Sequence, residues 1–150
     1  MSVITKRVIY MGPADGSDHK PLTIEGLAIA ATAPGSVVGE GVNGFTKLAD
    51  TSGDFIKQFL VADKDQQRSK SVDDDWTIAE NMVVIAPRSG EMVNVLCITA
   101  QAITAGIALA RSGTAGALKL AANDGTDEIV GYAAETVTTT ATQLVAVRVA

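Results

Sequence analysis

The sequence has little of the chemistry that enzymes use, because its 150 residues include only one histidine and one cysteine. His19 lies in a loop segment rich in Gly, Pro and Asp, where a Ser-His-Asp arrangement would have no firm support. One His and one Cys are also too few ligands for a zinc site. Cys97 cannot form an intrachain disulfide, and its apolar neighbours Leu96 and Ile98 predict a buried, inert thiol. We therefore expect no catalytic residue, no metal, no cofactor and no enzymatic activity.

The sequence also lacks the features of proteins that bind nucleic acid or span a membrane. The formal net charge is −5, and the basic residues are scattered, so direct binding to nucleic acid is not expected. Gly, Pro or charged residues interrupt every apolar run before the length of about 18 residues that a membrane-spanning helix needs. The N-terminus lacks the pattern of a secretory signal, which predicts synthesis in the cytosol. Aromatic residues make up 4% of the chain, so small and β-branched side chains must fill its core.

One segment matches a dinucleotide-binding motif but lacks the helix that should follow it. Residues 39–44 have the pattern G-x-G-x-x-G, and Asp63 follows about 20 residues later. The helix that should begin at Gly44 would meet the helix-breaking residues 51–54 within two turns, too soon to support a pyrophosphate. We interpret these glycines as tight turns or a flexible loop.

A second segment faintly resembles a calcium loop. In residues 63–75, Asp63, Asp65 and Gln67 occupy the first, third and fifth positions of such a loop. Arg68 stands where the sharp turn needs Gly, and Asp74 is shorter than the bidentate Glu normally found at the twelfth position. The segment alternates in charge, and we expect an exposed, solvated loop.

Short strand-like segments dominate the rest of the chain. Four of them, separated by turns rich in Gly, Ala and Thr, are residues 93–98, 117–120, 128–133 and 144–149. This spacing predicts a mainly β protein, a compact β-barrel or β-sandwich of short antiparallel strands with little helix. We expect an extended N-terminal arm over residues 1–25 and a single β-domain over residues 26–150, most regular over 88–150. Residues 54–62 fit either a helix or, at their end, a buried strand.

The order of these segments resembles the capsid decoration, or cement, proteins of tailed bacteriophages. In that family a strand start of the form G-[DE]-x-V is followed by an I-x-x-G-x-x-L hairpin. A G-x-L-x-x-A strand, an I-[IV]-G-x-A-x-E strand and a terminal V-x-V strand come after it. The matching segments here are residues 88–95, 102–109, 116–121, 129–137 and 145–149. Glu80-Asn81 stands where the family often has a Gly-Glu turn, and the first 58 residues match no family pattern.

The resemblance implies a structural virion protein, made in the host cytoplasm and located on the outer capsid surface. Its partner would be the major capsid protein, whose neighbouring subunits it would cement against internal DNA pressure. It also implies a homo-oligomer, with a trimer favoured over a dimer. The alternatives are another virion component, such as a tail-tube or head-fibre base protein, and a surface adhesin module with the same strand pattern.

The N-terminal segment supplies the candidate partner-binding residues. Val8, Ile9, Tyr10 and Met11 form an apolar stretch ahead of a loop rich in turn formers. An extended segment of this kind can add a strand to the open sheet edge of a partner. The same four residues fit equally well as the first strand of the protein's own barrel. The sequence leaves both alternatives open.

Overall fold

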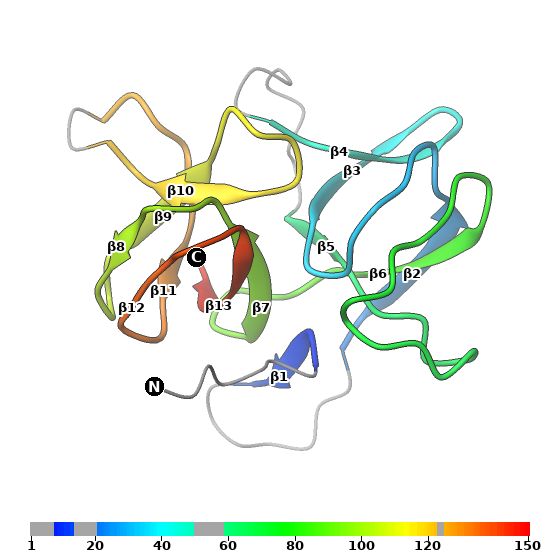
Figure 1. Ribbon diagram of the computed structural model, residues 1–150, viewed down its shortest axis with the longest axis horizontal. Helices are drawn as coiled ribbons and strands as arrows, with labels where there is room; N and C mark the ends of the chain where they lie inside the picture. The colour runs from blue at the N-terminus through cyan, green and yellow to red at the C-terminus, as the bar shows by residue number, and fades with distance from the viewer. Residues whose placement is uncertain (1–7, 14–20, 50–58, 123–124) are drawn as a thin grey trace.

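The computed structural model describes residues 8–13, 21–49, 59–122 and 125–150. Over these residues the chain forms thirteen strands and no helix, in two larger sheets and one two-stranded ribbon (Figure 1). The ribbon pairs β8 (Ala102–Ile103) with β12 (Val137–Thr138). The prediction of a compact, mainly β protein is confirmed.

The first sheet closes into a five-stranded barrel. Its strands are β7 (Met92–Cys97), β9 (Ala108–Arg111), β10 (Leu118–Leu120), β11 (Ile129–Ala133) and β13 (Gln143–Val149). Neighbours in the order β7-β10-β9-β11-β13 are hydrogen bonded, and the pairing of β13 with β7 completes the ring. The closure leaves no open sheet edge between these strands.

Strands β7 and β13 form the longest pairing of the barrel, because their β-branched residues alternate in phase. The antiparallel register runs from Gln143 opposite Cys97 to Arg148 opposite Met92. It places Val145 across from Val95, and all three of Val93, Val95 and Val145 are fully buried. Side chains on one face of a strand repeat every second residue, so this phase directs the valines into the barrel together.

The second sheet has five antiparallel strands in the order β2-β6-β5-β3-β4. They are β2 (Thr23–Leu27), β3 (Val37–Gly41), β4 (Gly44–Lys47), β5 (Leu60–Ala62) and β6 (Asn81–Ile85). A bridge between Ala28 and Phe45 joins the end of β2 to β4, so the sheet curls around its own interior. Phe45, Trp76 and Met82 are the largest residues of this second core.

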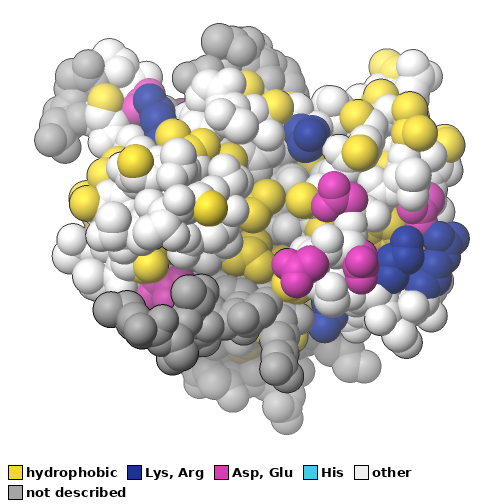
Figure 2. All heavy atoms as spheres, in the orientation of Figure 1, with side chains coloured by type: hydrophobic (Ala, Val, Ile, Leu, Met, Phe, Trp, Pro, Cys, Tyr) yellow, Lys and Arg dark blue, Asp and Glu magenta, His cyan; other side chains and the backbone are white. Residues whose placement is uncertain are grey.

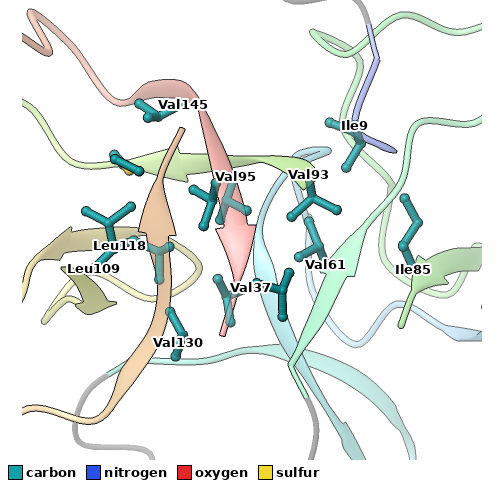
Figure 3. Packing of buried hydrophobic residues seen from close by; sticks show 14 of the residues in the cluster. Ile9, Val37, Val61, Ile85, Val93, Val95, Leu109, Leu118, Val130 and Val145 are labelled. Carbon is teal, nitrogen blue, oxygen red and sulfur yellow. The ribbon is translucent and has the colours of Figure 1, made fainter. Parts of the chain in front are cut away.

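The two sheets share one continuous core. Val37, Val61 and Ile85 of the five-stranded sheet belong to the same buried cluster as Val93 and Val95 of the barrel. Figure 3 shows these side chains around one region between the two sheets. Apolar burial stabilises a protein by about 25 cal/mol per Å² removed from water, so this shared cluster ties the sheets together.

Strand β1 (Tyr10–Gly12) decides between the two alternatives for the N-terminal segment. It pairs antiparallel with β7, with Tyr10 opposite Val93. The preceding residue, Ile9, is 1% exposed and belongs to the shared core. Residues 10–12 thus form a strand of the protein's own sheet, the second of the two alternatives, and β2 crosses the predicted boundary between residues 25 and 26. The rest of the predicted arm, residues 1–7 and 14–20, lies outside the described residues.

The glycines of residues 39–44 form a hairpin, as the interpretation of tight turns requires. Strands β3 and β4 pair up to Gly41 opposite Gly44, so Val42 and Asn43 make the turn. Gly44 has a φ of 137°, a conformation that side chains disfavour. For residues 54–62, the described end is the buried strand β5, and residues 54–58 lie outside the described residues.

Candidate functional site

The predicted partner-binding residues divide into buried and exposed members. Ile9 is in the core, and the Tyr10 hydroxyl donates a hydrogen bond to the Glu91 carboxylate. Val8 and Met11 are 46% and 44% exposed. These two side chains are therefore the only members of the stretch that present much surface to a partner.

A larger exposed apolar surface lies at the end of the five-stranded sheet. Leu27, Ile29, Val42 and Ile78 are all exposed, and Val42 at the hairpin turn is fully so. We call these four residues the apolar tip. In Figure 2 hydrophobic side chains gather at the upper right, over the end of the five-stranded sheet farthest from the barrel.

Backbone contacts hold three segments together to form the apolar tip. The Ile29 amide donates to the Phe45 carbonyl at 3.1 Å, which fixes the end of β2 against β4. The Ala79 amide donates to the Ala28 carbonyl at 2.8 Å, which brings the neighbouring Ile78 to the same end. The tip is thus built on paired strands and short, bonded turns. Because these segments are already held in place, they can present apolar side chains to a partner without having to become ordered on binding.

Two local features of the tip work against folding preferences. Turns favour Gly, Pro, Asn, Asp and Ser, yet the β-branched Val42 occupies the β3–β4 turn. Ala79 has a φ of 70°, in the left-handed region where a residue with a Cβ is strained by about 1–2 kcal/mol. Strained backbone concentrates at functional sites. Val42 is fully exposed and contributes nothing to the core, which favours a binding role for the tip.

A second candidate site is a polar groove beside the loop between β5 and β6. The groove has a volume of about 430 Å³, and its lining includes Glu25, Asp63, Asp65, Asn81 and Trp76. This volume is in the range of small-ligand pockets. We call it the acidic groove.

Asp63 is buried in the wall of the acidic groove. Its carboxylate accepts hydrogen bonds from the Lys64 amide at 2.8 Å and the Gln66 side-chain amide at 3.2 Å. Burial raises the pKa of the Asp63 carboxyl, and the two hydrogen bonds offset only part of that rise. The Asp63 carbonyl accepts a hydrogen bond from the Trp76 indole at 2.6 Å, so Asp63 and Trp76 hold each other in place.

Asp65 lies beside Asp63 and is 6% exposed. One carboxylate oxygen, Oδ1, accepts a hydrogen bond from the Arg68 amide at 3.2 Å. The other, Oδ2, is buried and has no hydrogen-bond donor; Arg68 Nε is 3.6 Å from it. The prediction of a wholly solvated loop is wrong for Asp63 and Asp65, because the Lys70 amide bonds to the Asp65 carbonyl and turns the loop inward.

The raised pKa of Asp63 predicts a pH-dependent effect of Asp63→Asn. A carboxyl whose pKa is raised by folding stabilises the folded state below its unfolded pKa, near 3.8, and that contribution is lost as pH rises through the folded pKa. Asparagine cannot ionise. We therefore expect the unfolding free energy of the variant, relative to the parent protein, to increase from about pH 3 to about pH 7. Urea unfolding at both pH values measures this difference, and a constant difference would contradict the assignment.

Cys97 and His19 are the two remaining residues that the sequence analysis singled out. Cys97 is fully buried, and burial, with a smaller contribution from Glu135, raises its thiol pKa to about 12. The prediction of a buried thiol is confirmed, and a thiol with this pKa carries almost no thiolate at neutral pH. His19 lies outside the described residues.

The described residues contain neither a metal-binding cluster nor a membrane-spanning helix. Within residues 8–13, 21–49, 59–122 and 125–150, no three His, Cys, Asp or Glu side chains are placed to hold a metal ion. None of the elements in these ranges is a helix with the length and apolar character to cross a bilayer.

No protein-family model matches the chain, and no curated protein matches its sequence.

Sequence reasoning missed both surfaces. The tip residues are far apart in the sequence, and only the strand pairing brings Leu27, Val42 and Ile78 to one end. For the apolar tip one local signal was present, the β-branched Val42 between the glycines of a predicted tight turn. For the acidic groove the signal was the pair of aspartates, which the sequence placed in a solvated loop.

Proposed function

We propose that this protein is a structural component of a bacteriophage virion that binds the outer face of the head. In this role it cements neighbouring major capsid subunits and stabilises the shell against internal DNA pressure. The order of strand motifs over residues 88–150 supports the proposal, since it is the order found in capsid decoration proteins. The closed barrel and its shared core supply the rigid scaffold that a cementing protein needs.

The observation that carries the proposal is the apolar tip. Exposed apolar side chains gathered at one place mark interaction sites, whereas scattered ones need no explanation. Fully burying a Val, Leu or Ile side chain contributes about 1.5–3 kcal/mol, so covering several of them favours association. We assign the tip as the capsid contact.

Oligomer formation would strengthen a contact of this size. One tip presents four side chains, a small surface beside the interfaces of stable complexes. A trimer would bring three tips to the lattice, and the second and third contacts would form at a high effective concentration. Modest single contacts would then hold the protein on the head.

The tip variant Val42→Asp tests the capsid contact. Val42 is fully exposed, so the substitution leaves folding intact, while a buried carboxylate at the contact is strongly unfavourable. We expect its apparent Kd for heads that lack the protein to rise about tenfold to a hundredfold in a co-sedimentation assay. Ile129→Asp is the matched control, because Ile129 is 44% exposed on β11 of the barrel and lies outside the tip.

Unchanged binding by Val42→Asp, with Ile129→Asp also normal, would remove the tip from the contact. Electron microscopy of virions labelled on this protein tests the location separately. Label on the outer head is the expected result. Label confined to the tail would instead favour the tail-tube or fibre-base alternative.

A further inference from the structure

The lining of the acidic groove carries more carboxylates than cationic side chains. Glu25, Asp63 and Asp65 contribute three carboxylates, whereas Lys64 and Arg68 contribute two cations. Arg68 is engaged outside the lining, because its Nη1 bonds to the carboxylate of Glu80. The groove is therefore suited to a ligand that donates hydrogen bonds and carries positive charge.

Asp65 supplies the position at which such a ligand would bind. Its Oδ2 atom is buried and has no hydrogen-bond donor in the structure. Arg68 Nε, at 3.6 Å, is close enough for charge attraction and too far for a hydrogen bond. A buried carboxylate oxygen without a donor is costly, and a donor that reaches it recovers much of that cost.

The surrounding groups hold this acceptor in a fixed place. The Arg68 amide binds Asp65 Oδ1, which orients the carboxylate. Trp76 forms part of the wall, and its indole is fixed by the Asp63 carbonyl. On the β2 side, the Asn81 side-chain amide lies 3.4 Å from a Glu25 carboxylate oxygen. These contacts hold the carboxylates of the groove in place before a ligand arrives.

We propose that the acidic groove binds a basic side chain, arginine or lysine, presented by a protein partner. Guanidinium and ammonium groups donate hydrogen bonds and accept none, and their bonds to carboxylates are shorter and stronger than neutral ones. A divalent metal fits less well, since no three acidic, His or Cys side chains are placed for it within the described residues. This inference goes beyond the capsid contact, because the groove and the apolar tip share no residue.

The single tryptophan gives a direct way to test the groove. Trp76 lines it and is the only tryptophan of the chain, so one indole N–H resonance in a ¹⁵N–¹H spectrum reports on this place. The probes are the blocked tripeptides Gly-Arg-Gly, Gly-Lys-Gly and Gly-citrulline-Gly. Citrulline has nearly the shape of arginine and no charge. We expect saturable shifts with the basic tripeptides, at a Kd of about 1 mM as for a small ligand, and no saturable shift with citrulline.

Asp65→Asn and Asp73→Asn form the matched pair of variants. Asparagine keeps an Oδ1 acceptor for the Arg68 amide and removes the charge, so the fold should persist; circular dichroism checks this. We expect at least about tenfold weaker binding of the arginine tripeptide by Asp65→Asn. Asp73 is exposed, lies outside the lining, and its variant should bind normally.

Three results would overturn the proposal. One is an equal response to the citrulline and arginine tripeptides, and another is normal arginine binding by a folded Asp65→Asn. The third is saturation by calcium chloride without any response to the basic tripeptides, which would assign the groove to a metal ion. All of these readouts are independent of phage heads, so they stand apart from the test of the apolar tip.

Discussion

Replacing Ile9 by alanine is expected to lower the unfolding free energy by about 2–5 kcal/mol. Ile9 is 1% exposed and packs in the cluster shared by both sheets. Its carbonyl accepts the Asn94 amide at 2.7 Å, and the Asn94 side chain donates to the Val8 carbonyl at 2.7 Å, so the cavity would lie beneath a fixed segment. A site that cannot collapse retains most of the cavity and its cost. Urea denaturation followed by circular dichroism measures the change.

Val8→Ala is the control for this prediction. Val8 is the adjacent residue and 46% exposed, so its truncation should change stability by no more than about 0.5 kcal/mol. Deleting residues 1–12 extends the test, because it removes Ile9 and the β1–β7 pairing together. A truncated chain with parental stability would show that the segment serves a partner and not the core.

The strands of the C-terminal half could be predicted because their signal is local. In β7 and β13 the β-branched residues alternate along each strand, and turn-forming residues mark the ends. Sequence boundaries for these two strands fall within one residue of the observed ones. The alternation itself indicates which side chains face the barrel interior, so no knowledge of the partner strand is needed.

The N-terminal segment shows where local patterns stop being sufficient. An apolar stretch such as residues 8–11 pairs equally well with a strand of its own chain or of a partner. The choice depends on β7, which lies about 80 residues later and offers its N-terminal half to β1 while its C-terminal end pairs with β10. Pairing between distant segments of this kind has no signature in either segment alone.

Neither the apolar tip nor the acidic groove could be predicted from the sequence, because at both surfaces the burial of the residues departs from what their local sequence indicates. Asp63 and Asp65 belong to a polar segment, and polar composition normally indicates solvent exposure. Backbone hydrogen bonds turn that segment inward and bury both carboxylates. At the apolar tip, hydrophobic residues that would ordinarily predict a core are left in solvent where the sheet ends. These departures from the local pattern are what mark the surfaces as candidates for binding.

Gly44→Ala is expected to be among the most damaging single substitutions outside the core. A Cβ at this position would lie 2.2 Å from the Leu27 carbonyl oxygen, a contact that no side-chain rotation relieves. Gly44 also has a φ of 137°, which side chains disfavour. We expect a loss of about 2–5 kcal/mol, combining backbone strain with a clash that separates β2 from β4. Since Leu27 belongs to the apolar tip, any chain that still folds should also bind heads more weakly.

Gly106→Ala separates the two causes. Gly106 has a φ of 90°, and a Cβ built there meets no atom within 4 Å, so its substitution adds backbone strain without a clash. We expect a loss of about 1–2 kcal/mol there, and head binding at the parental level. Equal losses for the two variants would mean that conformation alone sets the cost at Gly44. A larger loss at Gly44, with weaker head binding in that variant only, would show that the close approach of β2 and β4 both holds the five-stranded sheet closed and shapes the surface that binds.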